Sequence, residues 1–107
     1  SEDRMQGHII FKPSTETYTT TITNTTATLG AIPASVTRAI IQVETQDVRV
    51  TTDGSVPAQT RGLLLKAAAA GFPGMYVFEG YDSLSAMKLF RGAATDAVIN
   101  VVFQRPE

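Results

Sequence analysis

Residues 36–62 constrain the fold of this chain more than any other stretch, because apolar and polar side chains alternate along their first half. Ala39, Ile41 and Val43 fall on one side of an extended chain, opposite polar residues. A repeat of two residues is typical of a β-strand with one buried face and argues against an amphipathic helix. Ile40 is apolar but out of phase, so we expect a strand with some cover on its second face.

A second alternating segment, residues 47–51, follows a polar break. It places Val48 and Val50 on one side and so predicts another half-buried strand. Because the break between the two segments is short, we expect the two strands to form a β-hairpin.

The residues after this predicted hairpin are typical of turns. Gly54 follows Asp53 and can adopt a positive φ at no steric cost. Pro57 cannot donate a hydrogen bond to a sheet, so we expect the chain to leave the sheet there. The sequence therefore predicts structural turn roles for Asp53, Gly54, Pro57 and Gly62.

Other short apolar segments predict strands at residues 9–11, 75–79 and 97–103. The last segment is apolar almost throughout, which predicts a position inside the domain with cover on both sides. Short strands separated by glycine and proline are typical of an all-β fold. We expect a small β-sandwich or a jelly-roll-like barrel of antiparallel strands.

Two segments are ambiguous. Residues 63–71 are rich in leucine and alanine, which favour a helix, but the segment is short, so we expect irregular structure or one helical turn. Residues 84–91 fit either a strand through 86–91 or a helix that begins after Asp82 or Ser83. The shortness of this window favours the strand.

The chain of 107 residues has room for one domain. We expect residues 1–7 to be a flexible N-terminal arm and residues 8–107 to be a single β-sandwich domain. The formal net charge of -1 gives no electrostatic basis for binding nucleic acid or an anionic membrane. The absence of cysteine excludes disulfides and thiolate sites. The start of the chain is unlike a signal peptide, and no apolar run reaches the ~20 residues that span a bilayer, so a cytosolic product is expected.

Threonine occupies nine of the fourteen residues from Thr15 to Thr28. Its β-branched side chain is stiff and fits a pleated surface, so this segment favours a strand. An exposed edge strand or a long hairpin would account for the composition. The functional alternative is a polar face or arm that meets a partner, with Thr19, Thr21 and Thr23 as candidate partner-binding residues.

The sequence contains no recognisable catalytic constellation. Its single histidine, His8, has no partners for a multi-histidine metal site or a triad. The scattered aspartates adjoin turns, where a carboxylate usually bonds the backbone. We therefore expect a non-enzymatic protein with no catalytic residues, no cofactor and no metal.

Charged and aromatic residues suggest two kinds of binding. Arg49 and Arg61 flank the predicted turn and are candidate contacts to an acidic partner, although a solvated salt bridge within the domain is the commoner arrangement. Tyr18, Tyr76 and Tyr81 could instead form the platform of a carbohydrate-binding β-sandwich.

Several segments together resemble small structural proteins of tailed-phage virions, over roughly residues 31–103. They are Ile-Pro-Ala at 32–34, Ala-Ile-Ile-Gln-Val-Glu at 39–44, Asp-Val-Arg-Val at 47–50, Asp-Gly-Ser-Val-Pro at 53–57, Gly-Leu-Leu-Leu at 62–65, and Leu-Phe-Arg-Gly-Ala at 89–93 before Ala-Val-Ile-Asn-Val-Val-Phe at 97–103. The threonine-rich segment lies outside the resemblance. The alanine run from Ala67 departs from the shorter turn that the resemblance would lead us to expect there.

The resemblance implies a capsid decoration or cement protein, which is a compact β-sandwich or jelly-roll module that binds and stabilises the capsid shell. Implied partners are the major capsid protein or other virion proteins, without nucleic acid or membrane. The resemblance also implies a homo-oligomer, dimer or trimer, that assembles in the host cytoplasm and resides in the virion. A neck, tail or fibre-base component is the alternative. The family-like residues form a hairpin-and-turn block: Arg49, Asp53, Gly54, Pro57 and Gly62.

Overall fold

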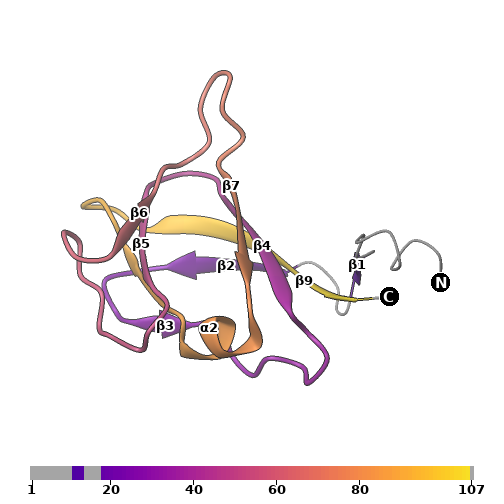
Figure 1. Ribbon diagram of the computed structural model, residues 1–107. Coiled ribbons are helices and arrows are strands. Elements are labelled where there is room, and N and C mark those ends of the chain that lie inside the picture. Colours follow the sequence, from indigo (N-terminus) through magenta and orange to yellow (C-terminus); the bar gives the residue numbers. More distant parts are fainter. Residues whose placement is uncertain (1–10, 14–17, 107) are drawn as a thin grey trace.

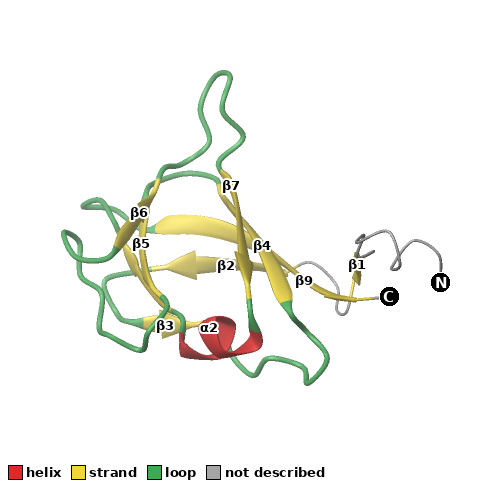
Figure 2. Cartoon of the chain, in the orientation of Figure 1, coloured by secondary structure: helices red, strands yellow, loops and turns green. Residues whose placement is uncertain are grey.

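The computed structural model describes residues 11–13 and 18–106, which form two antiparallel β-sheets and one short helix (Figures 1 and 2). This arrangement confirms the predicted small all-β sandwich. The strands are β1 (Phe11–Pro13), β2 (Tyr18–Ile22), β3 (Ala27–Thr28), β4 (Arg38–Val43), β5 (Val48–Thr51), β6 (Leu63–Leu65), β7 (Met75–Glu79), β8 (Lys88–Arg91) and β9 (Ala97–Pro106). The helix α2 (Tyr81–Ala86) follows β7, and no helix in the described ranges has the length and apolarity needed to cross a bilayer.

The two sheets are built around long-range strand pairs. The first, which we call sheet A, has the order β1-β9-β4-β7, and β2 also pairs with β9. β1 pairs with residues 104–106 of β9 and β2 with residues 97–101, so these two strands lie end to end along one edge of β9. The second sheet, sheet B, has the order β3-β8-β5-β6.

β9 is the central strand of sheet A. The predicted strand at 97–103 is confirmed and extends to Pro106. Ala97, Ile99 and Val101 are fully buried, whereas the residues between them are only half-buried. β9 therefore has neighbours on both edges but a buried surface on one face only, so the predicted cover on both faces is only partial.

The core between the two sheets is apolar throughout. In the described part of the chain, no polar or charged residue is fully buried. Burying a side chain the size of valine or isoleucine contributes roughly 1.5–3 kcal/mol, so a core of this kind can hold the sheets together without disulfides. The core residues are Ile22, Leu29, Ile32, Val36, Ala39, Ile41, Val43, Val48, Val50, Leu65, Leu84, Met87, Leu89, Ala97, Ile99, Val101 and Phe103.

The predicted hairpin is wrong, although both of its strands exist. β4 pairs with β7 and β9 in sheet A, and β5 pairs with β6 and β8 in sheet B. Residues 44–47 therefore cross from one sheet to the other, with Val43 and Val48 buried on either side of the crossing. Alternation identifies the buried face of a strand, but it does not identify the strand's partner.

The prediction of irregular structure or one helical turn at residues 63–71 is wrong for residues 63–65 and correct for residues 66–71, which are irregular. Residues 63–65 form β6, because they pair with β5. The following residues, 66–74, project beyond the sheets as a loop that we call the finger, seen at the top of Figure 1. At its tip, Ala69 and Phe72 exchange two main-chain hydrogen bonds of 2.9 Å.

The segment at 84–91 contains a helix as well as the preferred strand. β8 occupies residues 88–91, within the predicted strand. α2 precedes it and begins after Gly80 (φ 97°), not after Asp82 or Ser83. Leu84 is the buried residue of this helix, which makes α2 a short cover at one end of the core.

The N-terminal predictions are tested only in part. The first strand, expected at 9–11, is found at 11–13, and residues 9 and 10 lie outside the described ranges. The predicted arm at residues 1–7 and His8 also lie outside them. β2 pairs with β9 on one side only, which confirms an edge strand in the threonine-rich segment.

Candidate functional site

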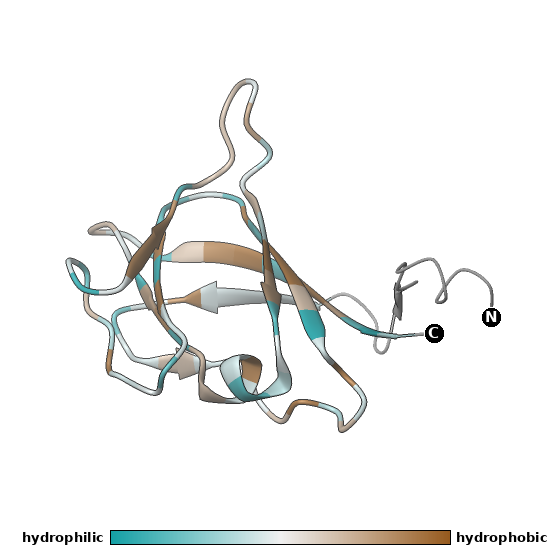
Figure 3. Cartoon of the chain, viewed as in Figure 1, coloured by the Kyte–Doolittle hydropathy of each residue, from teal (hydrophilic) through white to brown (hydrophobic). Residues whose placement is uncertain are grey.

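Exposed apolar side chains lie along two strand edges of the sandwich. Figure 3 colours the chain by the hydropathy of each residue. One group lies on β6 and the loop before it, and we call it the β6 surface: Val56, Leu63 and Leu64. The other follows the finger, β7 and the start of α2, and we call it the β7 edge: Phe72, Met75, Val77 and Tyr81. These are all the large exposed apolar side chains of the described residues. Apolar side chains that gather at one place on a protein surface often mark contacts with other molecules.

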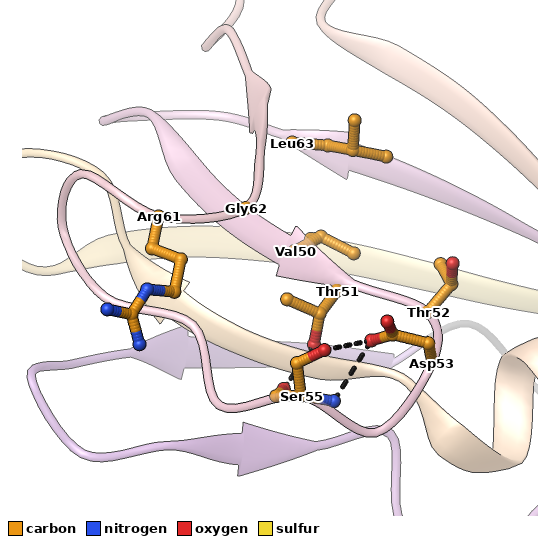
Figure 4. Close-up of a pocket in the computed structure, with 8 residues that line it drawn as sticks. All are labelled: Val50, Thr51, Thr52, Asp53, Ser55, Arg61, Gly62 and Leu63. Atoms are coloured by element: carbon orange, nitrogen blue, oxygen red, sulfur yellow. Dashed lines mark hydrogen bonds between the residues drawn. The ribbon is translucent and has the colours of Figure 1, made fainter.

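A pocket of about 450 Å³ adjoins the β6 surface (Figure 4). Its apolar residues, Val50 and Leu63, come from paired positions on β5 and β6. Hydroxyl groups, one carboxylate and one guanidinium complete the lining. The pocket residues are Val50, Thr51, Thr52, Asp53, Ser55, Arg61, Gly62 and Leu63.

A hydrogen-bonded turn forms one side of the pocket. The Asp53 carboxylate accepts hydrogen bonds from the Ser55 hydroxyl and from the Ser55 N–H (3.0 Å), and these bonds lower the pKa of Asp53. The Thr51 hydroxyl donates to the Ser55 carbonyl at 2.5 Å. Gly54 has a φ of 85°, as the turn requires. The predicted turn role of Asp53 and Gly54 therefore fits the geometry.

Gly62 and Pro57 fix the other parts of the pocket loop. Gly62 has a φ of 113°, and a Cβ there would lie 2.9 Å from the Val50 carbonyl oxygen. Only glycine fits a position with both constraints. Pro57 is buried, so the loop that leaves β5 returns against the body of the domain.

The Arg49 guanidinium is hydrogen-bonded to main-chain carbonyls within the domain. Its Nε donates to the Gln59 carbonyl and its Nη1 donates to the Gly62 carbonyl, both at 3.0 Å. Arg49 therefore ties the pocket loop to β5 through main-chain carbonyls. The expected alternative, a salt bridge within the domain, is not formed with any described residue.

Arg61 is the cationic group at the pocket rim. It is exposed, and its guanidinium forms no hydrogen bond or ion pair with the described residues. Its position is fixed by a tight turn, in which Ala58 and Arg61 exchange main-chain hydrogen bonds of 3.2 and 3.0 Å. In Figure 4 it lies on the side of the pocket away from Asp53. A partner carboxylate can reach this guanidinium without breaking a contact within the domain.

The candidate threonines lie elsewhere, at the β2 edge of sheet A. Thr19 and Thr21 are exposed, and the Thr19 hydroxyl bonds Asn100 Oδ1 at 2.6 Å. Thr23 lies beyond β2, where its carbonyl accepts a hydrogen bond from the Arg91 N–H at 3.1 Å. The structure therefore does not bring the threonines together with the pocket arginines.

The three tyrosines do not form one platform. The Tyr18 ring packs on Phe103, with ring centroids 6.0 Å apart, and burial raises the pKa of Tyr18. The Tyr76 ring packs edge-on against Phe72 at 6.2 Å. Tyr81 is exposed at the start of α2 and has no ring contact with the other two.

The base of the finger is anchored on both sides. The Asp47 carboxylate accepts the Ala67 N–H and the Lys66 ammonium, both at 2.9 Å. The Ala67 N–H, and then Lys66, hold the pKa of Asp47 below its usual value. The Tyr76 hydroxyl bonds the main chain of Lys66 from the opposite side. The finger therefore leaves the sandwich from a defined base.

Sequence reasoning found the pocket turn but missed its apolar neighbours. Three consecutive leucines have no period, so the pattern at 63–65 did not show which side chains point outward. A usable signal was the shortness of the leucine run, because only three leucines lie between Gly62 and Lys66 and so short a segment cannot bury every side chain. In the described residues, no group of three or more histidine, aspartate or glutamate side chains is placed to hold a metal ion.

Comparisons of the chain with protein-family models, curated proteins and solved structures found no match. The resemblance to virion structural proteins therefore stays a prediction that rests on the sequence segments alone.

Proposed function

We propose that this protein is a non-enzymatic virion structural protein of the capsid decoration type, and that it binds the capsid shell through the β6 surface and its pocket. The observation that carries the proposal is the exposed guanidinium of Arg61, held in a tight turn with Ala58, beside exposed Leu63 on β6. An apolar centre next to an arginine is the composition that strong protein contacts favour.

The geometry suits a protein partner. Leu63 is 59% exposed and Val56 is 57% exposed, so both can be covered without rearrangement. The pocket can accept an apolar side chain, and Arg61 can meet a neighbouring carboxylate. Because Arg49 and Gly62 hold the loop in place, little ordering entropy is lost on binding.

Repetition on a shell would strengthen such a contact. Leu63 and Leu64 are consecutive strand residues and point to opposite faces of sheet B, so a partner on the pocket side meets few exposed apolar residues and one such contact gives modest affinity. When many copies bind one lattice, or when copies are linked, the effective concentration raises the overall affinity without any new contact. A structural role of this kind is compatible with a small, rigid surface.

Co-sedimentation with purified empty capsid shells of the phage that encodes the chain tests the proposal. We expect Arg61→Glu and Leu63→Ser each to weaken binding by about tenfold or more, as loss of a central interface residue does. Arg105→Glu and Val102→Ser, a charge reversal and an apolar-to-polar change on β9 of sheet A, are the matched controls and should bind as the native chain does. Absence of binding at saturating protein, or equal binding by all four variants, would contradict the proposal.

A further inference from the structure

β7 is the outermost strand at one edge of sheet A. The Gly80 N–H donates to the Thr37 carbonyl at 2.7 Å, and at the other end of the strand the Val43 N–H donates to the Gly74 carbonyl at 2.8 Å. Gly74 and Gly80 are an even number of residues apart, so both belong to the same set of hydrogen-bonded positions. Hydrogen-bonded pairs recur at every second residue of an antiparallel ladder, so Tyr76 and Phe78 bond β4. The three other residues of the strand must turn their main-chain groups away from β4.

Those three residues, Met75, Val77 and Glu79, form an open edge. Among the described residues, no strand lies beside them and no group bonds their outward N–H and C=O. An unpaired strand edge is a template for another strand, and proteins commonly block it with proline or lysine. β7 contains neither residue.

The same edge carries four of the seven exposed large apolar side chains of the described residues. Met75 is 50% exposed and Val77 is 53% exposed on β7 itself. Phe72 lies just before the strand, and Tyr81 lies just after it. Unpaired main-chain groups and exposed apolar side chains therefore coincide along residues 72–81.

We propose that a second copy of this chain pairs with β7, antiparallel and about a two-fold axis at Val77. In this register Val77 lies opposite Val77 of the second copy, and Met75 lies opposite Glu79. It is the only register that pairs the three edge residues among themselves. A shift by two residues in one direction places Pro73, which has no N–H, in the ladder, and a shift in the other direction brings the two Glu79 carboxylates closer together.

The pairing also covers the apolar residues at the two ends of β7. Continuing the register places Pro73 opposite Tyr81 of the second copy, so Phe72 lies close to that ring as well. Each copy supplies both halves of this contact, as a two-fold interface requires. The resulting dimer joins two copies of sheet A into one continuous sheet.

The β7 edge is a better binding site for a second copy than the β2 edge on the opposite side of sheet A. At the β2 edge, Thr19 and Thr21 offer the outward main-chain groups, with polar side chains and no exposed large apolar residue. The β7 edge is therefore the self-complementary one. This inference goes beyond shell binding, because it uses a different surface.

Single cysteine variants test both the contact and its register, since the native chain has no cysteine. Hydrogen-bonded antiparallel residues have Cα atoms about 5.5 Å apart, within the range of a disulfide. We expect Val77→Cys to form a cross-linked dimer at least about tenfold faster than Thr21→Cys on the exposed β2 edge. Equal rates for the two variants, or faster cross-linking of Thr21→Cys, would overturn the proposal.

The register predicts a second result. Two Met75→Cys side chains would lie four residues apart along the strands, about 13 Å, and should not cross-link. A mixture of Met75→Cys and Glu79→Cys should form a mixed disulfide dimer. Rapid cross-linking of Met75→Cys alone, or of Met75→Cys with Val77→Cys, would exclude the register centred on Val77.

Sedimentation analysis without shells tests the dimer directly. Val77→Pro removes an outward N–H and no bond to β4, and Thr21→Pro makes the same change on the β2 edge. We expect Val77→Pro and Val77→Lys to raise the dimer dissociation constant by about tenfold or more, and Thr21→Pro to leave it unchanged. Circular dichroism checks that each variant is folded. A monomeric native chain, or a dimer unaffected by both Val77 changes, would overturn the inference. Neither result would bear on shell binding, which the co-sedimentation assay tests separately.

Discussion

The Tyr76 hydroxyl joins β7 to the first residue of the finger, because it accepts a hydrogen bond from the Lys66 N–H (2.6 Å) and donates one to the Lys66 carbonyl (3.0 Å). One side-chain oxygen thus satisfies both main-chain groups of a residue that has just left the β6 ladder. This bond pair is one side of the anchor that fixes where the finger begins.

Removing that hydroxyl should loosen the anchor. We expect Tyr76→Phe to lower the free energy of unfolding by about 1 kcal/mol, since both bonds are partly exposed and water can replace them. Urea unfolding measures the change as a lower midpoint with an unchanged slope. Tyr81→Phe is the control, because the Tyr81 hydroxyl bonds no described residue. Equal midpoints for the two variants would exclude a stabilising role for the Tyr76 hydroxyl.

Two finger glycines separate backbone strain from steric contact. Gly71 (φ 78°) and Gly74 (φ 68°) share a left-handed conformation, but a Cβ at Gly74 would lie 2.6 Å from Ala68 N and Val43 O, and one at Gly71 would meet nothing. We expect Gly71→Ala to cost about 1 kcal/mol and Gly74→Ala at least about 2 kcal/mol more. Thermal or urea unfolding of the two variants gives the difference directly. Similar stabilities would show that the backbone at Gly74 can move aside.

The two candidate arginines should behave in opposite ways in stability measurements. Arg49→Ala removes two hydrogen bonds that hold the pocket loop, so we expect a loss of about 1 kcal/mol after allowance for exposure. Arg61→Ala removes no bond to a described residue and should change stability by less than about 0.5 kcal/mol. Urea unfolding of both variants checks this contrast. A destabilising Arg61→Ala would reveal a contact that Arg61 makes within the domain.

The lowered pKa of Asp47 determines in which direction the stability of the fold changes with pH. Its folded-state pKa lies below the usual 3.8, chiefly because it accepts the Ala67 N–H. The native state therefore binds fewer protons than the unfolded state, so the contribution of Asp47 to stability is present above that value and is lost as the pH falls through the lower, folded-state pKa. Asp53 acts in the same direction.

We expect Asp47→Asn to destabilise the chain near neutral pH. The substitution should have little effect in strong acid, where the protonated Asp47 side chain is as uncharged as the asparagine that replaces it. Unfolding by urea at neutral pH and below about pH 3 measures this. Glu44→Gln, the same carboxylate-to-amide change at an exposed residue whose side chain bonds no described residue, is the matched control. If Asp47→Asn had the same effect at both pH values, the ionised carboxylate would not be the stabilising form.

Patterns and interactions among residues close together in the sequence predicted which strand faces are buried and where the chain turns. The buried residues of β4 and β5 follow from alternation alone, since a strand shows its period within six residues. The turn at Asp53 and Gly54 likewise follows from side chains that bond their own backbone. These features depend on neighbours in the chain and can therefore be predicted without the fold.

Features that depend on distant residues were not predictable in the same way. The leucines of β6 form a strand because β5 supplies hydrogen bonds, which overrides the helix propensity of that segment. The role of Arg49 depends on carbonyls ten and thirteen residues away in the chain. The same charge could equally have faced solvent, and composition does not distinguish the two outcomes.

The absence of fully buried polar residues from the described part of the core affects how the sequence can change during evolution. Valine, isoleucine and leucine can exchange in such a core at modest cost, because no buried polar partner fixes their identity. Gly62 and Gly74 have no such freedom, since a side chain at either would strike the backbone. We expect divergent descendants of this chain to keep the two glycines long after their interior residues have changed beyond alignment.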